Sequence, residues 1–317
     1  MKPDDKLFIQ TWERLGSSAE VAKELGQTIR NVMYRRRNIE VRYNITLKAK
    51  HQEKNNSFQS VGGVYPNKVD LGIRNGTVLV FSDAHFWPGI RTTAFRGLLW
   101  AIKELQPVAV INNGDAFDGA SISRHPRIMW QKVPSVMEEL KACQSSLEEI
   151  ESLVKSNCKL IWPLGNHDAR FESRLANGAP EFERVAGFRL KDHFAKWQPV
   201  WSVWVNDNVV VKHRFKGGIH ATHNNTMWSG KSIVTGHLHS LRVTPFSDYG
   251  GTRFGVDTGT LADPEGPQFR DYTEENPLNW RSGFAVLTLV DGHLLWPELV
   301  HRFADNVIEF RGKLIKV

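Results

Sequence analysis

The fold is indicated by residues 77–118, TVLVFSDAHFWPGIRTTAFRGLLWAIKELQPVAVINNGDAFD. An apolar run at 78–81 precedes a helical pattern at 91–105, and a second apolar run follows at 108–111. Alternation of short apolar runs with a helix of this length predicts a β-α-β unit with parallel strands. A further helix at 133–155 and a strand at 160–164 extend the same pattern.

Beyond residue 200 the chain changes to a succession of strands. They are expected at 209–212, 232–234, 254–256, 284–290 and 293–300. Asp291 and Gly292 separate the last two runs and predict a hairpin turn. We therefore expect an α/β fold in which two sheets form a β-sandwich flanked by helices.

The N-terminal residues differ in pattern from this α/β region. We expect a helical domain at 1–47, a polar linker at 48–76 and the sandwich domain at 77–317. Ser17 and Glu20 form a predicted capping box, and a helix at 28–37 would place Ile29, Val32 and Met33 on one side. The rest of the surface of this helix would carry the polar side chains Arg30, Asn31, Arg35, Arg36 and Arg37. A helix-turn-helix unit that binds nucleic acid and a helical cap with a solvated basic face both fit.

Charge and composition restrict the class of protein. The net charge is +7, and residues 1–60 hold 12 Lys and Arg against 7 acidic residues, an excess of +5. Such an excess favours a polyanionic partner such as nucleic acid. No apolar run approaches the roughly 18 residues of a membrane span, and the N-terminus does not resemble a secretory signal. We expect a cytoplasmic protein without a membrane partner, whose Cys143 and Cys158 are reduced thiols.

Polar side chains of the kinds that bind metals follow five apolar strands directly. The motifs are Asp83-x-His85, Gly114-Asp115-x-x-Asp118, Gly165-Asn166-His167-Asp168, His213 and Gly236-His237-x-His239. Each motif alone is explained by turn residues, helix caps or surface histidines. Together they place carboxylate, imidazole and amide donors, without thiolates, at strand ends where α/β proteins bind ligands. Two metal ions need seven or eight donors, and the loops offer Asp83, His85, Asp115, Asn166, His213, His237 and His239.

The ordered set of motifs, over about residues 77–300, resembles the calcineurin-like metallophosphoesterase superfamily. The resemblance implies that Asp83, His85 and His239 bind a first metal ion. It implies that Asn166, His213 and His237 bind a second ion and that Asp115 bridges both. The family often has Gly after the fourth-motif histidine, whereas Arg214 stands here, so His220 and His223 are weaker candidates for the same ligand.

The resemblance also implies a mechanism. Two cations about 3.5 to 4 Å apart lower the pKa of a bridging water, and the hydroxide attacks phosphorus in line. His167 is expected to be the general acid, Asp168 to orient its ring, and Asp118 to fix a loop or a ligand. Mn²⁺ is the ion we expect first, with Zn²⁺, Fe or Ni²⁺ as alternatives, because these donors accept all of them.

The sequence specifies the substrate less closely than it specifies the type of reaction. Gly119 and Asp168 depart from the protein phosphatases, and the motifs are more similar to double-strand-break repair nucleases and bacteriophage phosphoesterases. We expect phosphodiester hydrolysis in nucleic acid, in the host cytoplasm if the protein is phage-encoded. Arg124 or Arg170 could hold a substrate phosphate or pair with surface acids. Trp87, Trp130 and Trp228 could stack on bases or pack in loops.

Two alternatives stay open. One is a phosphatase for nucleotides or other small phosphate esters, in which the N-terminal helices bind a protein or cover a sheet. The other is a DNA-binding protein that uses the phosphoesterase domain as a scaffold. The sequence does not determine the oligomeric state.

Overall fold

A computed structural model describes residues 3–43, 45–47, 65–126, 128–274, 276 and 278–317. The chain divides into two compact units, Met1–Gly63 and Val64–Val317. The first part of the linker expected at 48–76, residues 48–64, lies outside the described residues, whereas its later part is described. Val69–Leu71 forms strand β1, which pairs in parallel with Val203–Val205.

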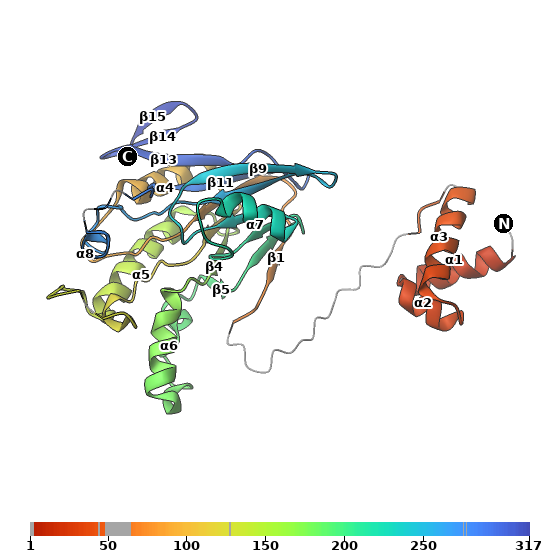
Figure 1. Cartoon of the computed structure of the whole chain (residues 1–317), viewed down its shortest axis with the longest axis horizontal. Helices are drawn as coiled ribbons and strands as arrows, with labels where there is room; N and C mark the ends of the chain where they lie inside the picture. Colours follow the sequence, from red (N-terminus) through yellow and green to blue (C-terminus); the bar gives the residue numbers. More distant parts are fainter. Residues whose placement is uncertain (1–2, 44, 48–64, 127, 275, 277) are drawn as a thin grey trace. The chain divides into compact units, whose positions relative to one another are not determined.

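The N-terminal unit is a bundle of three helices (Figure 1). They are α1 (Pro3–Leu15), α2 (Ser18–Glu24) and α3 (Ile29–Tyr43). Ser17 caps α2 and its side chain accepts a hydrogen bond from the Glu20 backbone N–H at 3.5 Å. The small core contains Phe8, Ile9, Trp12, Val21, Ala22, Val32, Ile39 and Leu47.

Helix α3 buries a different face from the one expected. It extends beyond residue 37, and its buried residues are Val32 and Ile39, two helical turns apart. Ile29 and Met33 are 52% and 49% exposed. The expected apolar side of this helix was therefore wrong for two of its three residues, because Ile39 packs below Val32 instead.

The larger unit contains two sheets. The six-stranded sheet is, in spatial order, β1 (Val69–Leu71), β6 (Val203–Val205), β7 (Val209–Val211), β8 (Ser232–Thr235), β10 (Gly251–Asp257) and β9 (Arg242–Asp248). The larger sheet is β15 (Lys313–Lys316), β14 (Val307–Phe310), β13 (Glu298–Ala304), β11 (Gly283–Val290), β2 (Gly76–Phe81), β3 (Ala109–Asn112), β4 (Lys159–Pro163) and β5 (Gln198–Val200). Short β12 (His293–Leu294) pairs with β11 across a turn in which Asp291 and Gly292 have φ of 49° and 81°. The expected strand at 293–300 is thus interrupted before β13.

Alternation along the strands explains the layers. Val78 and Val80 of β2 belong to the core between the two sheets, and Leu79 and Phe81 belong to the core under the helices. Strands β2, β3, β4 and β5 are parallel, as the β-α-β pattern requires. The structure confirms a β-sandwich flanked by helices.

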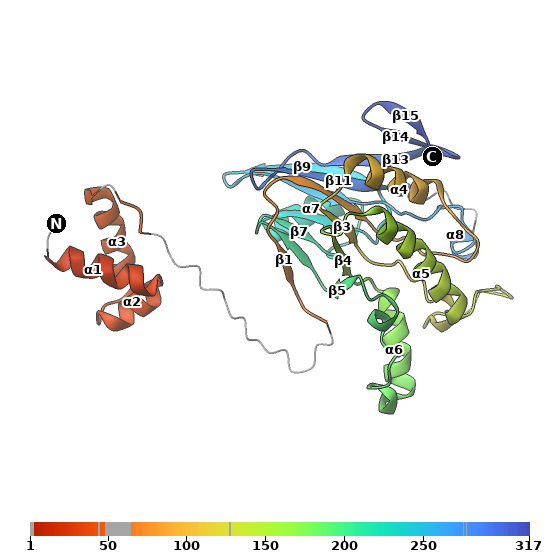
Figure 2. The same cartoon turned by 180° about the vertical axis from the view of Figure 1, so that it is seen from behind.

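Helices cover both outer faces. The remaining helices are α4 (Thr93–Leu105), α5 (Val136–Leu153), α6 (Asp168–Gly178), α7 (Ala221–Ser229) and α8 (Arg270–Thr273), with short 3-10 turns at Ala120–Ile122, Pro180–Phe182 and Leu190–His193. Helices α4 and α5 pack side by side (Figure 2), and α4 contacts β11, β13 and β14. Helix α7 packs on β8, β9 and β10. Among the described helices, none is long and apolar enough to cross a membrane.

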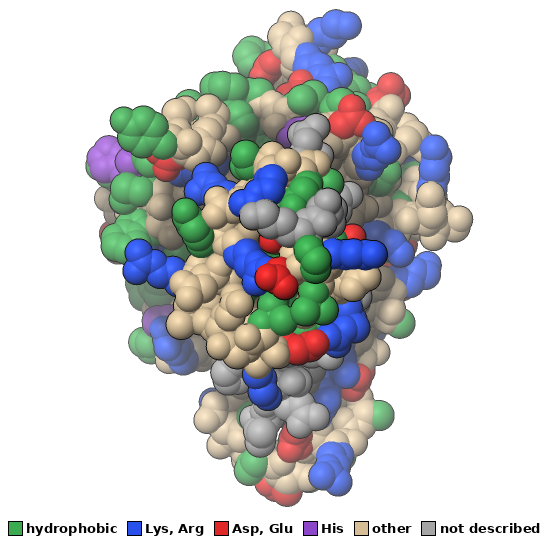
Figure 3. All heavy atoms as spheres, turned by 90° about the vertical axis from the view of Figure 1, so that its right-hand side faces the viewer, with side chains coloured by type: hydrophobic (Ala, Val, Ile, Leu, Met, Phe, Trp, Pro, Cys, Tyr) green, Lys and Arg blue, Asp and Glu red, His purple; other side chains and the backbone are tan. Residues whose placement is uncertain are grey.

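Basic side chains do not form one block on the face that Figure 3 draws. On the face drawn in Figure 3, Lys and Arg side chains lie interspersed with apolar and other polar ones. Local clusters, and not the net charge alone, must therefore identify any surface that binds an anion.

Candidate metal centre

Five loops at the ends of parallel strands converge on one edge of the sandwich. The loops follow β2, β3 and β4 in the larger sheet and β7 and β8 in the smaller one. Five of the expected ligands have a left-handed backbone conformation, with φ between 39° and 71°. They are Asp83, His85, Asp115, His237 and His239. Such conformations are unfavourable for residues other than glycine and cluster at functional sites.

The first group of side chains contains Asp83, His85 and His239. Their potential ligand atoms all lie within 4.8 Å of one another, and all three side chains are buried. Asp83 Oδ1 lies 3.1 Å from His239 Nε2. The other oxygen, Oδ2, accepts hydrogen bonds from Ser82 Oγ and from the His237 backbone N–H. One carboxylate oxygen is therefore held by the protein while the other faces the group.

The second group contains Asp115, His213 and His237, again with ligand atoms within 4.8 Å. His213 Nε2 lies 3.0 Å from Asp115 Oδ2 and 4.0 Å from Asp83 Oδ1, so the two groups adjoin. His213 Nδ1 donates to the Asn113 carbonyl oxygen at 2.7 Å, which directs Nε2 into the group. His237 is exposed, so this group opens to solvent.

The residue that follows Asn166 contacts the second group. The His167 backbone N–H donates to Asp115 Oδ1 at 2.8 Å, which holds the loop against that carboxylate. The alternative ligands His220 and His223 are exposed at the start of α7, whereas His213 is buried.

The donor set fits divalent metal ions. In the described part of the chain, Asp83 Oδ1, Asn166 Oδ1 and His213 Nε2 are buried without a hydrogen-bond partner. An unsatisfied buried polar atom costs about 1 to 3 kcal/mol, and cations bound at the two groups would satisfy all three. Nitrogen and oxygen donors without sulfur suit Mn²⁺, Fe and Zn²⁺.

Electrostatics favour a cation at the same place. Burial raises the pKa of Asp83, but the charges of His239 and His213 outweigh it and lower the pKa to about 2. Burial lowers the pKa of His213, but Asp115 and Asp83 outweigh it and raise the pKa to about 10. The paired carboxylates therefore stabilise positive charge, whether on a histidine or on a metal ion.

His167 lies beside both groups. Its ring is 4.7 Å from the ring of His85, centroid to centroid, and with His85 and Asp115 it forms a third set of mutually close ligand atoms. Burial lowers the pKa of His167, but the charges of Asp115 and Asp118 raise it overall. A raised pKa keeps a proton on the ring, which a general acid requires.

Asp118, and not Asp168, contacts the His167 ring. His167 Nδ1 donates to Asp118 Oδ1 at 2.8 Å, and His85 Nδ1 donates to the same oxygen at 2.8 Å. Asp118 therefore orients both histidines. Its backbone carbonyl accepts a hydrogen bond from Arg170, whose Nη2 lies 3.1 Å from His167 Nε2.

Asp168 makes a different set of contacts from the expected one. Its carboxylate accepts five hydrogen bonds, from the backbone N–H groups of Asp115, Ala116, Phe117 and Gly165 and from Trp162 Nε1, at 2.8 to 3.1 Å. The expectation that Asp168 orients the His167 ring is corrected by these contacts. Its position at the start of α6 aims the side chain at the loop after β3, which it fastens to the loop after β4.

Arg124 and Arg170, the two arginines expected to hold a substrate phosphate, lie in different surroundings. Arg170 lies at His167, whereas Arg124 is exposed and, in the described part of the chain, no hydrogen bond or ion pair links it to the two groups. Glu139 was missed: its carboxylate accepts from the backbone N–H groups of Gly119 and Ala120 and so holds the loop after Asp118. Glu139 is one of several polar residues of helix α5, and nothing in the sequence distinguishes it as the residue that makes this contact.

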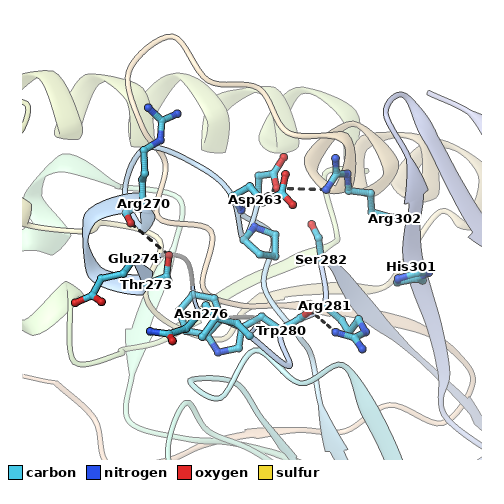
Figure 4. A pocket seen from close by; sticks show the side chains of 13 residues that line it. Asp263, Arg270, Thr273, Glu274, Asn276, Trp280, Arg281, Ser282, His301 and Arg302 are labelled. Atoms are coloured by element: carbon cyan, nitrogen blue, oxygen red, sulfur yellow. Dashed lines mark hydrogen bonds and ion pairs between the residues drawn. The ribbon is translucent and has the colours of Figure 1, made fainter.

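A cavity of about 640 Å³, drawn in Figure 4, adjoins the first group through Trp280. Its lining includes Asp263, Arg270, Trp280, Arg281, His301 and Arg302. The Trp280 ring is 4.4 Å from the His239 ring, and the Arg281 backbone N–H donates to the His239 carbonyl oxygen at 2.7 Å. Arg302 pairs with Asp263 across the cavity wall.

Comparisons with known proteins show the family to which the chain belongs. A family model described as calcineurin-like phosphoesterase matches residues 76–309. The gene 54 protein of Mycobacterium phage L5 is 27% identical over 252 residues, which cover 70% of this chain and 92% of that protein. The gene 54 protein of Mycobacterium phage D29 is 26% identical over 254 residues, with the same coverage of each.

Two solved structures are also similar to the chain. Vps29 from Entamoeba histolytica, in complex with zinc, has a TM-score of 0.40 at 12% identity and covers 76% of this chain and 98% of its own. A structure described as a novel archaeal phosphodiesterase has a TM-score of 0.36 at 14% identity and covers 70% of this chain and 99% of its own.

Proposed function

The chain belongs to the calcineurin-like phosphoesterase family and is a metal-dependent phosphoesterase, and we propose that it hydrolyses phosphodiester bonds in nucleic acid. The observation that carries the proposal is the pair of adjoining Asp and His groups, in which Asp83 Oδ1 lies 4.0 Å from His213 Nε2. Two neighbouring cation sites suit an in-line displacement at phosphorus.

The groups support a specific assignment of ligands. We assign Asp83, His85 and His239 to a first ion, Asn166, His213 and His237 to a second, and Asp115 to a bridging position. Asp115 suits the bridge because it has close ligand atoms in common with His85 on one side and with His213 and His237 on the other. We propose Mn²⁺ as the ion, with Zn²⁺, Fe and Ni²⁺ as alternatives that the same donors accept.

When bound, the two ions would activate a water for attack and neutralise charge that develops on phosphorus. The residues of the chain supply the proton. We assign His167 Nε2 as the donor to the leaving oxygen, because Asp118 holds the opposite ring nitrogen, Nδ1, at 2.8 Å. Arg170 Nη2 lies 3.1 Å from Nε2, so it must move to a substrate phosphate before Nε2 donates.

The N-terminal unit supports a nucleic-acid substrate through a subset of its basic side chains. Arg30, Asn31 and Arg37 are exposed on α3. Arg35 instead donates to the Asp4 carbonyl oxygen at 2.9 Å, and Arg36 pairs with Glu40 at 3.0 Å. We therefore propose that Arg30, Asn31 and Arg37 contact the nucleic acid and that Arg35 and Arg36 stabilise the helical unit.

A comparison of substrates tests the proposal. Hydrolysis of bis-p-nitrophenyl phosphate, p-nitrophenyl phosphate, and single- and double-stranded DNA with Mn²⁺ is measured for the wild type, Asp115→Asn and His167→Gln. Control variants are Asp207→Asn and His293→Gln, which change the same residue types at exposed positions away from the two groups.

The outcomes separate the alternatives. Metal-dependent cleavage of diester and DNA that both site variants lose, and both control variants keep, supports the nuclease. Cleavage of the monoester alone identifies a small-molecule phosphatase. DNA binding without hydrolysis of any substrate identifies a binding protein with a phosphoesterase scaffold.

The phage relatives lead us to expect that the protein acts in the cytoplasm of an infected host.

A further inference from the structure

The chain around the second group has an unusual charge distribution. Residues 208–247 contain no Asp or Glu, and they include His213, His237 and His239. The same residues contain the cations Lys212, Arg214, Lys216, Lys231 and Arg242. Within this stretch of forty residues no carboxylate neutralises these cations, so the stretch itself carries a net positive charge.

Some of these cations form a cluster with two exposed aromatic rings. We call Lys212, Arg214, Phe215, Lys216 and Trp228 the Phe215 cluster. Phe215 is 45% and Trp228 65% exposed. Lys216 Nζ lies 4.7 Å from the centroid of the Trp228 ring and 5.7 Å from that of the Phe215 ring, and Lys212 Nζ lies 5.3 Å from the Phe215 ring. Cations and aromatic faces thus alternate on one surface.

The cluster is held in place by buried contacts. The Lys216 backbone N–H donates to Oδ1 of buried Asn225 at 3.0 Å, which ties the loop to α7. The Lys212 backbone N–H donates to the Val234 carbonyl oxygen at 3.1 Å. Because the backbone is already fixed, binding a ligand there costs less conformational entropy than ordering a free loop would.

The cluster begins at the metal centre itself. Arg214 directly follows His213, and the His213 ring lies 5.4 Å from the ring of His237, the member of the second group that is exposed. A chain that leaves the centre on this side therefore meets Arg214 first. The cluster extends farther from the metal centre than a single small phosphate ester would reach.

We propose that the Phe215 cluster binds the single-stranded nucleic acid that adjoins the scissile phosphodiester, an inference that rests on the proposed function. Arg214 and Lys216 contact backbone phosphates, and the rings of Phe215 and Trp228 stack on bases. Alternating cations and exposed aromatic faces are the features by which proteins hold single strands. A duplex keeps its bases stacked inside, so the exposed rings favour a single strand.

The test uses the full-length protein and two variants, Trp228→Ala and Lys216→Gln. We expect Trp228→Ala to lower kcat/KM for a single-stranded oligonucleotide about tenfold more than for bis-p-nitrophenyl phosphate, because a base stacked on an aromatic ring contributes about 1 to 3 kcal/mol. Lys216→Gln should also lower kcat/KM more for the oligonucleotide than for the small diester, because a contact to a backbone phosphate is lost. Matched controls are Trp296→Ala, a 60% exposed tryptophan, and Lys313→Gln, an exposed lysine, which should not change the ratio of the two activities.

A binding measurement makes the test independent of turnover. Oligonucleotide affinity is measured by fluorescence anisotropy as a function of salt in Asp115→Asn, alone and combined with Lys216→Gln. Loss of one phosphate contact should reduce the slope of log affinity against log salt by about 0.7. An unchanged slope and affinity, equal losses on both substrates, or a preference for duplex DNA would overturn the proposal.

The two proposals fail in different ways. If no phosphodiester is hydrolysed while the Phe215 cluster still determines binding of the single strand, the proposed function is wrong and the binding surface stands. If bis-p-nitrophenyl phosphate is hydrolysed and the cluster variants bind the oligonucleotide like the wild type, the binding surface is wrong and the phosphodiesterase stands.

Discussion

Replacing Asp168 by Asn should destabilise the fold, whereas the same change at Asp118 should reduce activity. Asp168 accepts five hydrogen bonds, three on Oδ2 and two on Oδ1. Asparagine retains one oxygen, so at least two buried donors lose their acceptor and face an NH₂ group. At about 1 to 2 kcal/mol for each donor, the free energy of unfolding should fall by about 2 to 4 kcal/mol.

The assay is urea unfolding of the full-length variants in excess EDTA, so that metal binding does not contribute to stability. With an m value of about 3 kcal/mol per molar urea, the midpoint should fall by about 1 M. Asp118→Asn is the matched control, because Asp118 is also buried but orients two histidine rings. It should keep most of the stability and lose more than about tenfold in kcat/KM.

One pattern of results would refute this reasoning. If Asp168→Asn unfolds like the wild type and loses activity to the same extent as His167→Gln, then Asp168 acts on the general acid and its five contacts contribute little. A change in the pH profile of hydrolysis should appear in Asp118→Asn, because one of the two carboxylates that raise the pKa of His167, the other being Asp115, loses its charge.

Three further predictions follow from buried groups near the centre. Burial and the charge of Asp118 raise the pKa of Glu139 from 4.5 to about 7. The neutral side chain therefore stabilises the fold fully below about pH 4.5, by at most about 3 kcal/mol. This contribution is lost as the pH rises through about 7. Urea unfolding at about pH 5 and about pH 8 should show a smaller difference in Glu139→Gln than in the wild type, and an equal difference would contradict the assignment. The raised pKa of His213, about 10, predicts that metal binding near neutral pH releases a proton. Calorimetry in two buffers of different ionisation enthalpy should then give different apparent enthalpies, and identical values would exclude proton release. Gly165→Ala should abolish hydrolysis, because a Cβ there would clash with the Asp115 carboxylate and lie 2.6 Å from the Asp115 backbone nitrogen; retention of near wild-type kcat/KM would show that the two loops can separate.

Local patterns of the sequence determined the fold class and the residues of the ligand loops. Apolar runs of strand length, each followed by Asp, Asn or His, predict both a parallel sheet and polar side chains at one of its edges. Such features depend on neighbours within a few residues of one another. The structure accordingly brings the ligand atoms of Asp83 and His85, which share one loop, and of His239, which lies much later in the chain, to within 4.8 Å of one another.

Tertiary structure alone decided which polar group contacts which. Asp168 and Asp118 are both carboxylates in the expected loops, but only the packing of α6 against the loop after β3 aims Asp168 at five N–H groups and leaves His167 to Asp118. The same holds for Arg36, which pairs with Glu40 instead of facing solvent, and for Trp228, which meets Lys216. Spacing along the chain specifies periodicity and strand ends, whereas the direction of a side chain depends on elements that are distant in sequence and meet only in the folded state.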